Sequence, residues 1–555
     1  MADQKSEISN QQLDPQGRIP IGFVVGGGLK ENLVVRLDVP ASSVQEGAFV
    51  VIQSDDWIFH GVVTDIQLGA TDPRFADEKT GDRLPSELTD LLHGQTLFTN
   101  LEVLPQLMIT GGEEPQGPLP VKTIPAHHSD AFLASEGDVA EIFKGNFVIG
   151  HTREQGHPVA IDLDKFVKRS SGIFGATGTG KSFLTRLLLA GLIKYDKSSV
   201  LVLDMHNEYA FDDRDEDDKP VTGLRTKFTT KVRVVGLGAG ALIRGQMPDF
   251  HLEVAMSDIQ PEDIELLTRE LNLKETTPAT LDALVATFGR KNWFRGFKNM
   301  KSGAVIEDTE GKKMAAPDSV AAWAEDHGVN IMAAEGLHNK LGRVFRLPYV
   351  TDHPAADAIG EIVKALEAGQ HVVLSFGEHE SDLDYLLVSN LLTRRIRRRW
   401  EERTNKFRTT GKDEPRPLVI ALEEAHKLLN REMAVQTTFS TIARELRKYY
   451  VTLLIIDQRP SQIYDEVMSQ LGTRVSGWLG DDDDIRAVLS GLAGRDALRG
   501  MLARLQPKEE VLLLGWGVPM PLPVRSRRYD DAFWKELLPG KGKRGEKEIK
   551  EELGF

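Results

Sequence analysis

One glycine-rich segment has the spacing of a phosphate-binding loop: residues 175–182 read GATGTGKS. Its glycines permit backbone conformations that aim successive N–H groups at phosphate oxygens, and a helix beginning there adds partial positive charge. We expect Lys181 to reach the β- and γ-phosphates of ATP and to act in catalysis, and the Ser182 hydroxyl to ligate Mg²⁺. The residues predicted to bind the nucleotide here are Gly175, Ala176, Thr177, Gly178, Thr179, Gly180, Lys181, Ser182 and Phe183.

The segments on both sides of this loop support the same interpretation. An apolar stretch precedes it, GIF at residues 172–174, and an amphipathic stretch follows it, FLTRLLLAGLI at residues 183–193. The alternative is a chance glycine turn, which does not account for a strand, a loop and a helix in this order. The sequence therefore predicts a P-loop that binds ATP.

Two glutamates follow a second apolar strand. Residues 418–422 read LVIAL, a run typical of a buried parallel strand, and Glu423 and Glu424 come directly after it. Because ligands bind beyond the carboxyl ends of such strands, we expect Glu423 to join the Mg²⁺ shell and Glu424 to orient the attacking water as the catalytic base. The alternative is that both only cap the helix continuing through HKLLNREM. His426 has two open interpretations, a polar packing residue or a link to the γ-phosphate.

Three further residues are candidates for sensing or stabilising the transferred phosphate. Gln458 follows the apolar run VTLLIID at residues 451–457, where a neutral amide suits a sensor of the γ-phosphate; the alternative is an ordinary loop residue. Arg444 and Arg447 share one face of a helix predicted over residues 432–449, so either can serve a neighbouring subunit's ATP in trans. The alternative for that helix is a solvated or DNA-facing basic face.

The densest basic cluster lies on another predicted helix, at residues 383–403. It allows two interpretations, a surface that grips phosphates or a solvated face paired with Glu401 and Glu402. The cluster consists of Arg394, Arg395, Arg397, Arg398, Arg399 and Arg403.

Strands alternating with helices from His157 onward indicate an α/β fold with a parallel sheet. Short β-branched runs separated by glycine and polar turns indicate a small barrel before it. The predicted domains are a β-barrel at 1–150, an α/β core at 151–255 and 356–510, a helical insertion at 256–355, and a C-terminal segment with a flexible tail at 511–555. The family resemblance given below implies that the core is RecA-like and that the C-terminal segment is a brace. Acidic runs at 212–218 and 481–484 are expected in solvated loops.

The composition narrows the possible classes of protein. The 555 residues include no cysteine, which excludes disulfides and thiolate metal sites and suits a reducing cytoplasm. A formal charge of −15 argues against a surface that coats nucleic acid generally, although a local basic channel is compatible with it. The polar N-terminus and the lack of a long apolar run predict a cytoplasmic protein that does not span a membrane.

Taken together, these motifs resemble the HerA family of hexameric RecA-like translocases, related to the FtsK group. The likeness is carried by IGFVVGGG and GVVTDI in the barrel, then GIFGATGTGKS, LVLDMHNEY, LEEAHKLL, IARELRKY and DQRPSQI, and finally VLLLGWGVPMPLPVR. The resemblance places Asp204 and Glu208 in an acidic motif near the nucleotide. It implies a homohexameric ring with double-stranded DNA in its pore, working with a NurA-like nuclease or a sirtuin-type or other effector in DNA-end processing or antiviral defence.

The sequence departs from the family pattern at two positions. Glu423 stands where the family usually has aspartate, which we expect to change the geometry of the Mg²⁺ contact without inactivating the site. Asp457 stands where a serine often precedes Gln-Arg-Pro. The leading hypothesis is an ATP-driven DNA translocase or helicase; the alternatives are an ATP-controlled ring scaffold for a partner effector and a soluble conjugation or secretion ATPase.

Overall fold

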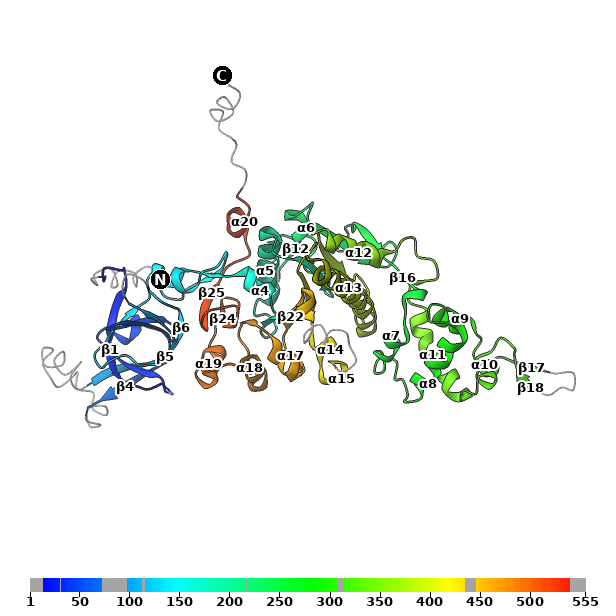
Figure 1. Ribbon diagram of the computed structural model, residues 1–555, viewed down its shortest axis with the longest axis horizontal. Helices are drawn as coiled ribbons and strands as arrows, with labels where there is room; N and C mark the ends of the chain where they lie inside the picture. Colours follow the sequence, from blue (N-terminus) through cyan, green and yellow to red (C-terminus); the bar gives the residue numbers. More distant parts are fainter. Residues whose placement is uncertain are drawn as a thin grey trace, which may run out of the picture. The chain divides into compact units, whose positions relative to one another are not determined.

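The computed structural model describes residues 13–29, 31–71, 97–111, 115–215, 218–307, 313–434 and 446–539. The chain forms two compact units, each built from segments that are distant in sequence. The first contains residues 1–191, 458–461 and 471–555, and the second contains residues 192–457 and 462–470. Figure 1 labels their helices and strands.

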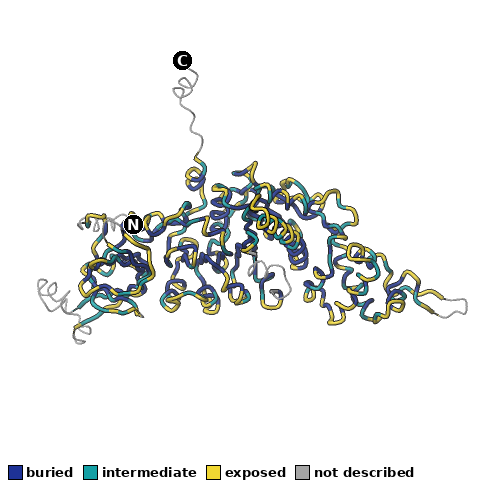
Figure 2. Tube along the Cα trace, in the orientation of Figure 1, coloured by how far each residue is buried: buried dark blue, intermediate teal, exposed yellow. Residues whose placement is uncertain are grey.

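The first unit begins with a small antiparallel barrel, drawn mainly in blue in Figure 1. Strands pair in the order β2-β1-β7-β3-β4-β5-β6, and β2 also pairs with β5, which closes the ring. Its strands are β1 (Ile19–Gly26), β2 (Leu33–Leu37), β3 (Phe49–Ser54), β4 (Trp57–Ala70), β5 (Leu97–Thr110), β6 (Leu119–Pro120) and β7 (Asp130–Leu133). Val35, Val50 and Val103 are among the buried residues that fill the interior. Figure 2 shows buried residues along these strands.

The rest of the first unit carries the glycine-rich loop. There β10 pairs in parallel with β23, and antiparallel strands continue the order through β24, β25, β8 and β9. The strands are β8 (Phe147–His151), β9 (Pro158–Ile161), β10 (Ser171–Phe174), β23 (Thr473–Ser476), β24 (Glu510–Gly515) and β25 (Leu522–Ser526). The helices are α3 (Glu136–Ile142), α4 (Leu163–Val167), α5 (Lys181–Tyr195, which ends in the second unit), α18 (Asp482–Leu489), α19 (Arg495–Ala503) and α20 (Asp531–Leu537).

The second unit contains parallel strands in the order β15-β14-β20-β11-β21-β22. They are β11 (Ser199–Asp204), β14 (Val232–Leu237), β15 (Phe250–Leu252), β20 (His371–Ser375), β21 (Leu418–Glu423) and β22 (Val451–Asp457). Every residue of β11, β20, β21 and β22 is buried, as their continuous apolar sequences require of strands covered on both faces. The accompanying helices are α6 (Leu224–Lys227), α12 (Ala358–Glu367), α13 (Asp382–Thr410), α14 (His426–Leu429), α15 (Arg431–Ala434) and α17 (Asp465–Gln470).

A helical segment interrupts this second unit between β15 and α12. Its two ends meet as the paired strands β16 (Val254–Ala255) and β19 (Val350–Thr351). Trp293, Phe294 and Phe297 are fully buried in its core. Its helices are α7 (Pro261–Glu265), α8 (Thr277–Phe288), α9 (Trp293–Asn299), α10 (Val320–Asp326) and α11 (Ile331–Phe345), with the hairpin β17 (Val305–Glu307) and β18 (Lys313–Ala315).

The expected fold class, α/β with an N-terminal small β-barrel and a helical insertion, is confirmed. The helix predicted at 383–403 runs longer, through Asp382–Thr410. The acidic run at 481–484 is not a loop: Asp481 caps α18 by accepting backbone N–H groups, and the next three acids form its first turn. Within the described residues, no helix has the length and apolar character needed to cross a membrane.

Candidate nucleotide-binding and catalytic site

The glycine-rich loop of the first unit links β10 to α5, as predicted. Ala176 N–H donates to the carbonyl of Trp478 at 2.9 Å, and the hydroxyl of Thr179 donates to the carbonyl of Ala176 at 2.7 Å. Gly175 must be glycine, because a Cβ there would lie 2.5 Å from the Thr179 hydroxyl oxygen. Thr177 and Gly178 are exposed at the tip. The loop is therefore held by a bond within it and by a bond to Trp478, and its tip is exposed.

Lys181, Ser182 and Phe183 form the first turn of α5 and are half-buried. The Lys181 ammonium donates to the carbonyl of Ala176 at 3.0 Å, so its charge is held over the loop. The guanidinium of Arg186 lies 5.5 Å from the centre of the Phe183 ring. Lys181 and Ser182 thus stand where a phosphate bound by the loop and helix N-terminus would be met by positive charge and a hydroxyl.

Gln458 belongs to the first unit and contacts the glycine-rich loop directly. The Thr177 hydroxyl donates to Gln458 Oε1 at 2.6 Å. This bond joins residues 281 positions apart in the sequence. The predicted sensor therefore lies beside the phosphate-binding loop.

In the second unit, the parallel register brings the predicted acids to one edge of the strands. Asp204 is the partner of Ser375 on β20, and the preceding pair, Leu203 with Leu422, places Asp204 level with Glu423. Glu423 is in turn the partner of Ile456, next to Asp457. The ends of three different strands therefore bring acids to within one residue of the same level.

Asp204 is fully buried at this edge. Its carboxylate accepts backbone N–H bonds from Glu208 at 2.8 Å and Tyr209 at 3.1 Å, and a hydroxyl bond from Ser375 at 3.2 Å. Burial raises the pKa of Asp204 to about 6, although the two backbone bonds act in the opposite direction. Asp204 thus organises the turn that carries Glu208.

Two buried tyrosines donate hydrogen bonds to Glu423. The Tyr209 hydroxyl donates to Glu423 Oε1 at 2.7 Å, and the Tyr385 hydroxyl donates to the Glu423 carbonyl at 2.8 Å. Burial, and then the charges of Asp204 and Glu208, raise the pKa of Glu423 well above its ordinary value. Its other carboxylate oxygen, Oε2, is buried without a hydrogen-bond partner among the described residues.

The Mg²⁺ that a P-loop implies fits this arrangement. The unpartnered Oε2 of Glu423 is an oxygen that a cation or its bound water can satisfy, and a nearby cation would relieve the repulsion among the buried acids. Over the described ranges, no group of three or more histidines and acids is arranged to hold a metal ion alone.

Glu424 lies in a turn beyond β21 with a φ of 44°, in the left-handed region that a glutamate rarely adopts. His426 follows, and its ring Nδ1 lies 3.0 Å from Asp457 Oδ2 and 3.6 Å from Glu424 Oε2. Burial alone would lower the pKa of His426, but the hydrogen bond and charge of Asp457, together with Glu424, raise it. The departure at Asp457 is thus explained by a contact, since this carboxylate binds His426.

Of the two candidate trans arginines, Arg447 lies in the 3-10 helix Leu446–Tyr449 and is exposed. Arg444 lies outside the described residues, as does most of the helix predicted at 432–449; the described parts are α15 and this 3-10 helix. The exposure of Arg447 is compatible with a role toward a neighbouring subunit and equally with a solvated basic helix.

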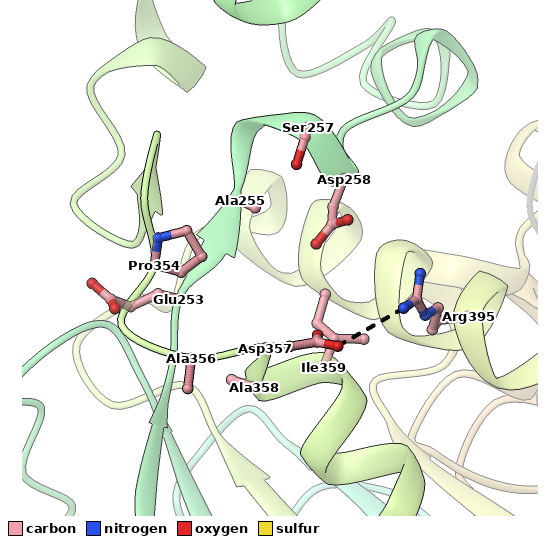
Figure 3. Close-up of a pocket in the computed structure, with 10 residues that line it drawn as sticks. All are labelled: Glu253, Ala255, Ser257, Asp258, Pro354, Ala356, Asp357, Ala358, Ile359 and Arg395. Atoms are coloured by element: carbon pink, nitrogen blue, oxygen red, sulfur yellow. Dashed lines mark ion pairs between the residues drawn. The ribbon is translucent and has the colours of Figure 1, made fainter. Parts of the chain in front are cut away.

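The structure favours ion pairing over phosphate binding for the basic cluster on α13. Every member has a carboxylate partner: Arg394 with Asp263 (2.8 Å), Arg395 with Asp357 (3.9 Å), Arg397 with Glu401 (2.9 Å), Arg398 with Glu402 (3.1 Å), and Arg399 and Arg403 with Glu367 (2.8 and 3.1 Å). A cavity of about 290 Å³ beside Arg395 and Asp357 is lined by none of the predicted site residues (Figure 3).

Sequence reasoning missed Tyr209, Tyr385 and the Asp457–His426 pair. The position of Tyr209, five residues after Asp204 and in the same motif, was the one local signal for it. Tyr385 and Asp457 carried no local signal, because their contacts depend on how the strands and α13 are packed.

Comparison with known proteins gives a consistent picture. A family model described as "Helicase HerA, central domain" matches residues 147–396. The DNA double-strand break repair helicase HerA of Pyrococcus furiosus is 22% identical, covering 82% of this chain and 83% of that protein. The protein of that name from Sulfurisphaera tokodaii is 24% identical, covering 92% of this chain and 93% of that one.

A weaker likeness exists to a solved structure. The bacterial conjugative coupling protein TrwBdeltaN70 is 12% identical, with a TM-score of 0.44, covering 71% of this chain and 92% of that one. A likeness at this level carries no argument about function.

Proposed function

Because this chain belongs to the HerA family of P-loop ATPases, we propose that it is an ATP-driven translocase or helicase on double-stranded DNA, acting as a homohexameric ring in the cytoplasm. The observation that carries the proposal is the likeness to two DNA double-strand break repair helicases over more than four fifths of this chain. The P-loop with an adjoining polar sensor supports it, because both are features of ATP hydrolysis.

We assign a role in hydrolysis to each candidate residue. The loop from Gly175 to Ser182 binds the phosphates, with Phe183 following in α5, and Lys181 stabilises the charge that develops on them. Glu424 orients and deprotonates the attacking water, and Gln458 senses the γ-phosphate. Ser182 and Glu423 would hold Mg²⁺, which when bound neutralises phosphate charge, and Asp204 supports the turn carrying Glu208.

The ring itself rests on the family likeness. One of Arg444 and Arg447 would complete the ATP site of the next subunit, so that hydrolysis depends on assembly. DNA in the central pore would be held through its phosphates. A NurA-like nuclease or a sirtuin-type or other effector would act on the DNA that the ring delivers, in DNA-end processing or antiviral defence.

The first test is the rate of ATP hydrolysis by the purified protein with and without linear double-stranded DNA, at several salt concentrations. DNA should stimulate hydrolysis, and the stimulation should fall steeply with salt, because binding to phosphates releases counterions. Lys181→Ala serves as the blank, since the same preparation without the loop lysine reports contaminating activity.

Hydrolysis that ignores DNA at every salt concentration would reject the motor for the isolated protein. It would favour a ring that assembles a partner effector under the control of ATP. Sedimentation of the same samples with a non-hydrolysable nucleotide would then separate a ring that forms without DNA from a chain that does not assemble.

A further inference from the structure

We propose that Asp457 is a positioning residue for hydrolysis, whose buried carboxylate holds the turn that presents Glu424 by binding both the backbone amide and the ring of His426. The inference rests on the proposed role of Glu424 as the base. It adds a residue that does not touch the water or the phosphates and acts through His426.

The turn needs to be held, because its backbone is strained. Glu424 has a φ of 44° although it is not glycine, and a glutamate side chain is too long to stabilise this conformation through the short local hydrogen bonds available to asparagine and aspartate. Such conformations persist where the surrounding structure fixes them, and they cluster at functional sites. The contacts that fix this turn are therefore candidates for part of the machinery.

The end of β22 supplies these contacts. The amide of Ala425 donates to the carbonyl of Ile456 at 3.5 Å, and the amide of His426 donates to Asp457 Oδ2 at 2.7 Å. The same Oδ2 lies 3.0 Å from His426 Nδ1. Asp457 is only 1% exposed, so its geometry is fixed by packing. One carboxylate thus holds both the backbone and the ring of the residue two positions after Glu424.

Asp457 also determines which way the imidazole donates. An ionised carboxylate can only accept, so the bond to Asp457 requires the hydrogen on Nδ1. Glu424 Oε2 lies 3.6 Å from the same nitrogen, which makes it the competing acceptor. With Asp457 in place, the N–H is engaged and the ring is held beside the turn. Without Asp457, the amide and the ring of His426 would lose their shared acceptor, and the turn that carries Glu424 would lose this support.

The test combines Asp457→Asn, His426→Gln and the double variant, using the full-length protein. We expect Asp457→Asn to lower kcat by between about 10- and 100-fold, as misplacement of a catalytic group does, while KM for ATP changes less than about twofold. Because Asp457 acts through His426, the double variant should be no slower than the slower single variant. Affinity for a fluorescent ATP analogue and melting temperature are measured in parallel.

Asp263→Asn is the matched control, since Asp263 is equally buried in the same unit but pairs with Arg394. It should lower the melting temperature and leave kcat nearly unchanged. Asp457 would be merely structural if the falls in kcat of the two single variants multiply in the double variant. The same conclusion would follow if Asp263→Asn, at an equal loss of melting temperature, lowers kcat as much as Asp457→Asn does. If Asp457→Asn does not fold, His426→Gln decides alone: an unchanged kcat overturns the inference.

Glu424→Gln separates this inference from the role on which it rests. If Glu424→Gln still hydrolyses ATP, the assignment of the base fails, and the positioning role fails with it. If Glu424→Gln is inactive while Asp457→Asn keeps its full kcat, the positioning role alone is wrong.

Discussion

The glycine-rich loop of the first unit and the acidic edge of the second are built in opposite ways. The loop is assembled from consecutive residues and held largely by its own backbone, as in the bonds of Thr179 and Lys181 to the Ala176 carbonyl. The acidic edge is assembled from side chains on separate strands, with Tyr209 reaching Glu423 across 214 positions of sequence. An anion-binding site can thus be formed by consecutive residues, whereas a cluster of acids from several strands forms only when the sheet is complete.

The two regions also differ in electrostatics. The loop has an exposed tip at Thr177 and Gly178, so a phosphate can approach without displacing side chains. At the acidic edge, burial raises the pKa of Asp204 to about 6 and raises the pKa of Glu423 well above its ordinary value. The loop therefore offers positive charge to an anionic ligand, whereas the acidic edge would be stabilised by a cation. Loss of Lys181 from the loop should weaken nucleotide binding as well as hydrolysis, whereas loss of the Glu424 carboxylate should slow hydrolysis alone.

The largest effect expected is that of Lys181→Ala. Removing the loop ammonium should lower ATP hydrolysis about 1000-fold or more and weaken nucleotide affinity, because the charge acts on the phosphates in both ground and transition states. Steady-state hydrolysis and binding of a fluorescent ATP analogue measure the two effects. Lys194→Ala, on the last turn of α5, is the control and should behave as wild type.

Glu424→Gln should reduce kcat by between about 100- and 1000-fold while nucleotide affinity remains within a few-fold of wild type. The amide keeps the shape of the side chain but cannot accept a proton. Glu432→Gln, exposed on α15, controls for loss of one negative charge. If the Glu424→Gln protein also fails to bind ATP, the expectation that Glu424 acts on hydrolysis and not on nucleotide binding is wrong.

Tyr209→Phe should have an intermediate effect: the Mg²⁺ concentration needed for half-maximal nucleotide binding should rise about 10-fold. The substitution removes one hydrogen bond to the Glu423 carboxylate and leaves the ring packing intact. The expected signature is a higher Mg²⁺ concentration for half-maximal nucleotide binding, measured by titration with a fluorescent ATP analogue. The half-buried Tyr464→Phe is the control. An unchanged Mg²⁺ dependence would mean that Glu423 is positioned without this tyrosine.

Thr177→Val should have the smallest effect, about two- to fivefold on kcat, because it removes one neutral, exposed hydrogen bond to Gln458. Thr177→Ser keeps the hydroxyl and should restore the wild-type rate. If Thr177→Val lowers kcat as much as Glu424→Gln does, the loop also depends on long-range side-chain contacts. The loop and the acidic edge would then differ less in how they are built.

Much of the loop was predictable because its information is contiguous, with the glycines, Lys181 and the flanking apolar runs all within one segment. The strand ends were predictable for a similar reason, since β21 and β22 are continuous apolar runs that stop at a polar residue. These features depend on neighbours in sequence.

The contacts between strands were not predictable, because they require the strand order and register. The role of Asp457 illustrates this, since nothing near it in sequence identifies His426 as its partner. The Asp481 cap is a different kind of miss: an acid followed by an apolar helical pattern is a local signal for a helix start. On α13, the four-residue spacing of Arg397 and Glu401 indicated their pairing. Nothing in the sequence indicated that Asp263 pairs with Arg394, because the two residues are distant along the chain.

Helix α13, 29 residues long, has a mechanical consequence. Tyr385 near its start holds the Glu423 carbonyl, and Arg394 farther along binds the fully buried Asp263 at the first turn of α7. Tyr385 and Arg394 lie about 14 Å apart along the axis of α13, at a rise of about 1.5 Å per residue. A shift of the backbone at Glu423 would therefore arrive at the helical insertion as a displacement of α7, with no loop in between to absorb it.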